Sequence, residues 1–65
     1  MLKYRTSTGD LIFINPHSIA AVQMSEDIST YSYIFTSGGC WLVQRDCQDV
    51  IADLRNYFNT VSNAD

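Results

Sequence analysis

Residues 30–44 constrain the fold most, because they have the pattern of a β-hairpin. Residues 30–36 are aromatic, β-branched and alternating, which is typical of a strand. Gly38 and Gly39 suit a two-residue turn, since glycine adopts the positive φ that such turns need. Residues 41–44 then return as a second strand, so we expect an antiparallel sheet at the centre of the fold.

Shorter strands and one helix are predicted around this hairpin. Residues 2–6 and 11–14 are rich in β-formers and flank a polar turn at residues 7–10. Residues 19–24 are expected to form another strand, although their two alanines would also suit a helix. Pro16 separates this segment from the preceding strand because proline cannot donate to the ladder. The expected fold class is α+β: an antiparallel sheet of four to five short strands, built from β-hairpins, followed by one C-terminal helix packed on one face.

The C-terminal helix is predicted from a capping residue and from apolar periodicity. Asp46 can cap the helix, and Asp49 lies in its acidic first turn. Apolar side chains recur at helical spacing and form one stripe of Cys47, Val50, Ile51, Leu54 and Phe58. We expect a single α+β domain over residues 1–61 and a flexible C-terminal tail at residues 62–65.

The short length of the chain raises the question of what stabilises it. A domain of this size buries only about 60% of the surface of its unfolded chain, and many small domains add disulfides, metals or oligomerisation. Cys40 and Cys47 flank a strand that spans more than ~10 Å, whereas bridged Cα atoms lie within about 7 Å. Two cysteines and one histidine also match a four-ligand zinc site poorly. We therefore expect reduced cysteines and no cofactor or metal.

The charge pattern argues against nucleic acid as a partner, and the apolar pattern argues against a membrane. The net charge is −3, and the basic residues Lys3, Arg5, Arg45 and Arg55 are scattered. Nucleic-acid binders usually carry a basic face that displaces counterions from phosphates, so nucleic-acid binding is disfavoured. No apolar run reaches the ~18 residues of a membrane helix, and the N-terminus lacks a secretory signal. We expect a cytoplasmic protein that does not enter the membrane.

Alternation along the strands predicts apolar side chains on both faces of the sheet. In the central hairpin, one face carries Tyr31, Tyr33, Phe35 and Leu42, and the other carries Ile34, Trp41 and Val43. In the first hairpin, Leu2, Tyr4, Leu11 and Phe13 are expected on one face, and Ile12, Ile14, Lys3 and Arg5 on the other. One helix covers one face, so the open face is expected to bind a partner, most commonly a second copy. The alternative is that the aromatic side chains are scattered over the surface without forming a contiguous patch, in which case they imply no partner.

The candidate interaction surface joins the aromatic row of the central hairpin to apolar residues of the second strand: Tyr31, Tyr33, Phe35, Trp41, Ile12 and Ile14. Tyrosine and tryptophan are enriched at protein interfaces. Aromatic side chains on a sheet can also stack bases, but such grooves need basic residues, and this hairpin supplies only Arg45.

No catalytic residue is predicted, because His17 lies in a turn without a paired nucleophile and no glycine-rich phosphate loop is present.

The same features, taken in chain order, resemble a known family. They are an opening Met1-Leu2-x-Tyr4 strand, Gly9, Phe13-Ile14-Asn15, Ile19-x-x-Val22, Tyr33-x-Phe35, a glycine turn, Trp41-x-Val43 and Val50-Ile51. This order resembles the FlbD-like family of small flagellar and swarming-motility proteins over nearly the full chain, and also the first half of a LytTR-type DNA-binding domain. The resemblance implies a small non-enzymatic regulatory or adaptor protein, and prophage and plasmid proteins share the outline.

The leading functional hypothesis is a homo-oligomeric interaction module that acts by binding a larger protein partner. One alternative is a protein that binds a small nucleotide-type ligand between subunits through Tyr31, Tyr33 or Trp41. Another alternative is a DNA-contacting regulator, which would bind in a salt-dependent manner.

Overall fold

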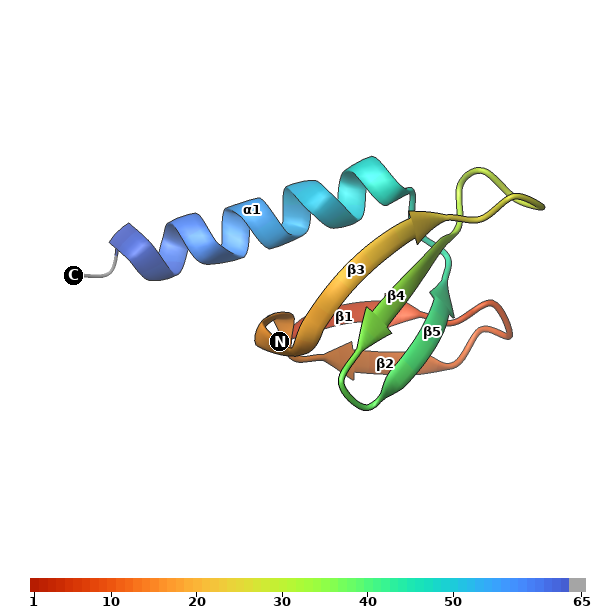
Figure 1. Cartoon of the computed structure of the whole chain (residues 1–65), viewed down its shortest axis with the longest axis horizontal. Helices are drawn as coiled ribbons and strands as arrows, with labels where there is room; N and C mark the ends of the chain where they lie inside the picture. The colour runs from red at the N-terminus through yellow and green to blue at the C-terminus, as the bar shows by residue number, and fades with distance from the viewer. Residues whose placement is uncertain (64–65) are drawn as a thin grey trace.

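The computed structural model describes residues 1–63 and has the predicted α+β fold. The elements, in chain order, are β1 (Leu2–Arg5), β2 (Leu11–Ile14), the 3-10 turn η1 (Pro16–Ser18), β3 (Ile19–Met24), β4 (Ser32–Thr36), β5 (Gly39–Val43) and α1 (Cys47–Asn63). Figure 1 shows these strands followed by the single long helix. The segment expected to form a flexible tail, residues 62–65, lies partly in α1 and partly outside the described residues.

The strands form two antiparallel sheets that are joined at one end. One sheet pairs β1 with β2, and the other has the order β3-β4-β5. The join is a bridge between Thr6 and Val43, beside which the Gln44 N–H donates to the Arg5 carbonyl at 2.8 Å. Because the join is at one end, the β1–β2 hairpin crosses one face of the three-stranded sheet (Figure 1).

The turn between β1 and β2 is shorter than the predicted four residues. The Gly9 N–H donates to the Thr6 carbonyl at 2.9 Å, and the Thr6 N–H donates to the Asp10 carbonyl at 2.8 Å. Gly9 has a φ of 89°, so this is a type I turn followed by a bulged glycine. Arg5 therefore pairs with Leu11, and the register of the whole hairpin follows from this pair.

This register makes the predicted faces of the first hairpin wrong. Tyr4 lies opposite Ile12, and residues directly opposite each other share a face. The inward face carries Leu2, Tyr4, Ile12 and Ile14, and the outward face carries Lys3, Arg5, Leu11 and Phe13. All four outward residues are exposed, and Phe13 reaches 62% exposure.

The central hairpin has a different turn from the predicted one but the same faces. Thr36 pairs with Gly39, so the two turn residues are Ser37 and Gly38 rather than the glycine pair. The Thr36 hydroxyl accepts from the Gly38 N–H at 3.1 Å and donates to the Gly39 carbonyl at 2.9 Å, which closes the turn. The predicted register is wrong by two residues, an even number, so the side chains within β4 and β5 keep their predicted faces. Tyr31 lies before β4 and belongs to neither face.

The core lies where both sheets and the first half of α1 meet. Its buried apolar side chains are Tyr4, Ile14, Ile34, Val43 and Val50, of which the last three are fully buried. They come from β1, β2, β4, β5 and α1, so every layer contributes to one cluster. The inner face of the three-stranded sheet is therefore covered jointly by the first hairpin and the helix, which packs on β3.

Helix α1 is anchored through its N-terminal half. Asp46 caps it as predicted, because its carboxylate accepts from the Gln48 N–H at 2.9 Å. Val50 is fully buried, but Ile51 is 42% and Phe58 38% exposed, so only part of the predicted stripe is buried. The C-terminal half extends beyond the strands (Figure 1). Within residues 1–63, no helix has the length and apolar content to cross a membrane.

Candidate functional site

The structure places the residues of the candidate interaction surface in separate locations. Tyr33 and Phe35 point outward from β4, whereas Trp41 and the β2 residues Ile12 and Ile14 line a cleft on the opposite side of the sheet. Tyr31 precedes β4 and is half-buried in the loop after β3. The predicted surface is therefore divided between two regions.

The first region is the outward face of the three-stranded sheet, here called the outer sheet face. Strand alternation assigns to it the residues that flank the buried Ile34 and Val43 positions: Ala21, Gln23, Tyr33, Phe35, Cys40 and Leu42. None of these side chains is charged. Phe35 is 37% exposed and Cys40 is exposed, and both the hairpin and α1 pack on the other face. The outer sheet face is thus an uncharged surface without a covering layer among the described residues.

The second region is a cleft of about 410 Å³ between β2 and the β4–β5 turn, here called the Trp41 cleft. Ile12, Phe13 and Ile14 line one wall, and Trp41 and Gly38 lie on the other. Trp41 is 43% exposed although it shares the inward face with Ile34, because it lines this cleft rather than the core. Ile14 is 5% exposed and belongs to the core, so its side chain forms the floor rather than the rim.

Strand β2 presents an unpaired edge beside this cleft. Within residues 1–63, β2 pairs with β1 alone. Thr6 donates its N–H toward β2, whereas the carbonyl of Arg5 accepts a hydrogen bond on the opposite side, toward β5. Bonded and non-bonded positions alternate along an antiparallel pair, so the even-numbered residues form the hydrogen bonds between β1 and β2. The main-chain N–H and C=O groups of Leu11 and Phe13 therefore point away from β1. Their side chains are 45% and 62% exposed, so this edge is open and apolar.

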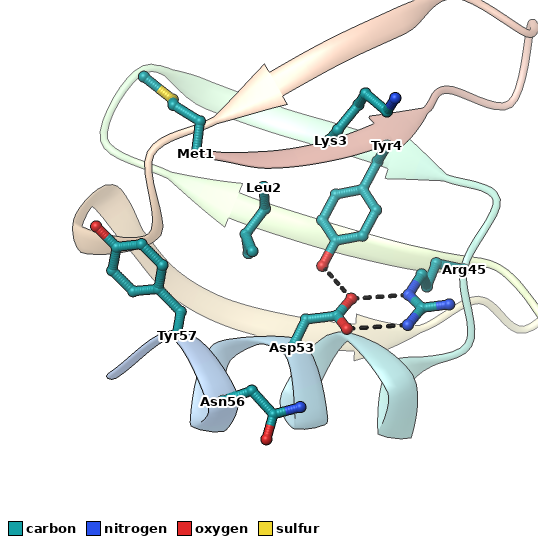
Figure 2. A pocket seen from close by; sticks show the side chains of 8 residues that line it. All are labelled: Met1, Leu2, Lys3, Tyr4, Arg45, Asp53, Asn56 and Tyr57. Atoms are coloured by element: carbon teal, nitrogen blue, oxygen red, sulfur yellow. Dashed lines mark hydrogen bonds and ion pairs between the residues drawn. The ribbon is translucent and has the colours of Figure 1, made fainter. Parts of the chain in front are cut away.

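A third region is a groove of about 590 Å³ between β1 and α1, here called the Tyr4 groove (Figure 2). The Tyr4 hydroxyl points from β1 toward α1 and donates to Asp53 Oδ2 at 2.7 Å. Arg45, from the β5–α1 connection, donates to the same carboxylate through Nε at 2.7 Å and Nη2 at 2.9 Å. Met1, Leu2 and Tyr57 line the apolar end of the groove (Figure 2).

These hydrogen bonds shift the protonation equilibria of all three groups. The hydrogen bonds from Arg45, and to a lesser extent that from Tyr4, lower the pKa of Asp53. Burial and the adjacent carboxylate raise the pKa of Tyr4, and the pairing with Asp53 raises the pKa of Arg45. At neutral pH the cluster is therefore an ion pair with a neutral phenol. Both carboxylate oxygens already accept strong hydrogen bonds, so the cluster connects β1, the β5–α1 connection and α1.

This cluster was not predicted from the sequence, although the position of Asp53 in the helix is one feature that could have indicated it. Asp53 follows the buried Val50 by three residues and therefore lies on the same side of the helix. A carboxylate next to a core position needs hydrogen-bond donors. Which donors would meet it could not be deduced, because Tyr4 is 49 positions away in the chain.

The remaining candidate residues for chemistry do not assemble into a site. His17 lies at the surface, where its ring contacts Phe58 and Tyr57 edge-on at centroid distances of 5.2 and 5.8 Å. Cys40 and Cys47 are both free, one on the outer sheet face and the other in the first turn of α1. Across the described part of the chain, no group of three or more His, Cys, Asp or Glu side chains is arranged to hold a metal ion.

Comparison with known proteins gives no further assignment. No family model, curated protein or solved structure matches this chain. The resemblance to the FlbD-like family and to the LytTR-type domain therefore stays a prediction from the sequence.

Proposed function

We propose that this chain is a small non-enzymatic interaction module that self-associates and binds a larger protein partner. The observation that carries the partner-binding part of the proposal is the outer sheet face, an uncharged surface opposite the side covered by the hairpin and α1. Apolar side chains left on a sheet face without a covering layer are typical of protein-binding surfaces, where charged residues are depleted and aromatic residues enriched.

The aromatic side chains give this surface a binding centre. Tyr33 lies directly opposite Leu42, and Phe35 directly opposite Cys40, on the two neighbouring strands β4 and β5. Tyr33 and Leu42 are half-buried, so they are already held in place by their neighbours. A partner would meet side chains that lose little conformational freedom on binding, which favours affinity. The proposal includes a regulatory or adaptor role, which the FlbD-like resemblance implies, and a cytoplasmic location, which follows from the sequence pattern.

Charge insertion on the outer sheet face tests the proposal. Phe35→Asp places a carboxylate at the centre of the surface, whereas Gln48→Asp adds the same charge at an exposed position on α1. Native mass spectrometry of the tagged protein purified from host lysate should show a bound protein with the wild type and with Q48D. F35D should lose that species while keeping its circular dichroism spectrum.

Self-association is measured separately on the purified chain. Light scattering at high micromolar concentration should give a mass above the 7.4 kDa of one chain. A strict monomer would contradict the self-association part of the proposal. Equal recovery of the bound species by F35D, Q48D and the wild type would contradict the assignment of the outer sheet face as the docking surface.

A further inference from the structure

We infer that the self-association surface is the free edge of β2, which pairs antiparallel with β2 of a second copy. This inference rests on the proposed self-association and specifies its geometry. Strand β2 has two features that suit it: its outer edge is unpaired within residues 1–63, and its exposed side chains are apolar. Unpaired edges of this kind are templates for another strand.

The backbone of β2 is complementary to itself. Leu11 and Phe13 both direct their N–H and C=O groups to the free edge, and they are separated by one residue. A two-fold axis at Ile12 would place Leu11 of each copy opposite Phe13 of the other. Each such pair can then exchange hydrogen bonds in both directions, as closely spaced antiparallel pairs do. A two-fold contact of this type closes on itself and gives a dimer rather than a fibre.

The side chains of β2 favour a second copy as the occupant. Residues 11–14 carry no charge, so two copies meet without like charges facing each other. On the outward face, Leu11 and Phe13 of both copies would form one apolar row, which would reduce the 62% exposure of Phe13. On the inward face, Ile12 of each copy would meet Ile12 of the other at the edge of the Trp41 cleft.

The small size of the edge sets the strength that is expected. A standard interface removes about 800 Å² from each partner, close to a fifth of the 4428 Å² surface of this chain. A strand of four residues covers less than this. The dimer should therefore be weak and in rapid exchange, and it should be populated in the high micromolar range.

Two variants and one exchange measurement test the inference. Phe13→Lys replaces an exposed side chain and puts a charge on the edge, which is a common protection against strand pairing. Phe35→Lys makes the same change on the outer sheet face. Analytical ultracentrifugation should show concentration-dependent self-association for the wild type and for F35K, whereas F13K should sediment as a monomer at every concentration.

Hydrogen exchange on the wild type gives an independent readout that does not depend on a variant folding. The amide protons of Leu11 and Phe13 should exchange at least about tenfold more slowly at high than at low micromolar concentration. Those of Ile12 and Ile14, which already bond to β1, should change much less. A monomeric wild type would overturn both this inference and the proposed self-association. A wild type that associates while F13K associates equally, or without slowing at Leu11 and Phe13, would overturn the inference alone.

Discussion

Removal of the Asp53 charge should destabilise the whole domain. The Asp53 carboxylate accepts from the Tyr4 hydroxyl and from two nitrogens of Arg45, and it thereby joins β1, α1 and the connection before α1. Asp53→Asn keeps the size of the side chain but removes the ion pair. The amide group would also place its own N–H donors near donors of Arg45 or Tyr4, so at least one hydrogen bond is lost.

The structure bounds the size of this effect. Asp53 is 24% and Arg45 41% exposed at their side chains, which places the pair between a surface and a buried ion pair. Exposed pairs contribute roughly 0.2–1 kcal/mol, and breaking a buried pair costs about 3–5 kcal/mol. We expect D53N to lower the free energy of unfolding by about 1–3 kcal/mol. For a domain of this size that corresponds to a melting temperature lower by about 5–20 °C.

The effect should depend on pH with a defined sign. The pKa of Asp53 is lowered in the folded state by the hydrogen bonds from Arg45 and Tyr4. Its contribution to stability is therefore fully present above the unfolded pKa of about 3.9, and it is lost as the pH falls through the lower folded pKa. The difference between wild type and D53N should be largest at neutral pH and should shrink in strong acid.

Urea unfolding across a pH series measures this difference. Asp27→Asn is the matched control, because it removes the same charge from an exposed loop residue. D27N should follow the wild type closely at every pH. The reasoning would be refuted if D53N matched the wild type at neutral pH, or if its deficit persisted unchanged at a pH where Asp53 of the wild type is protonated.

Other substitutions test the core and the connection before α1. Val50→Asp puts a charge at a fully buried position and should leave no folded population in circular dichroism at neutral pH, whereas Ile51→Asp, at the next and 42% exposed position, should stay folded. Folded V50D would show that the helix contact is misassigned. Ser32→Ala removes a buried hydroxyl that donates to the Arg45 carbonyl at 2.6 Å, and should cost about 1–3 kcal/mol in urea unfolding; an unchanged midpoint would contradict this.

The sequence predicted the elements and their order because the signals for them are local. The alternation through Tyr33, Ile34 and Phe35 gives the two faces of β4, and the faces of the whole central hairpin were assigned correctly because the error in register is two residues, an even number. The faces of the first hairpin were not, because they depend on whether its turn has three or four residues. Gly9 fits either turn, and the bulge that distinguishes them is visible only in its hydrogen bonds with Thr6 and Asp10.

Features that depend on distant parts of the chain could not be predicted. The apolar stripe of α1 continues to Phe58 in the sequence, but Phe58 is 38% exposed, because the C-terminal half of the helix extends beyond the strands and Phe58 contacts the ring of His17 there. The pairing of Tyr4 with Asp53 arises where β1 meets α1, and the Trp41 cleft arises from the crossing of the two sheets. Periodicity within one segment carries no information about that crossing.

Trp41 can serve as an intrinsic fluorescence probe of the region around the Trp41 cleft. It is the single tryptophan, and at 43% exposure its indole is partly in water beside the free edge of β2. Indole emission moves to shorter wavelength when water is excluded from the ring. A strand or side chain that occupies this cleft should therefore change the fluorescence of the unlabelled protein, whereas a partner seated on the far side of the sheet should leave it nearly constant.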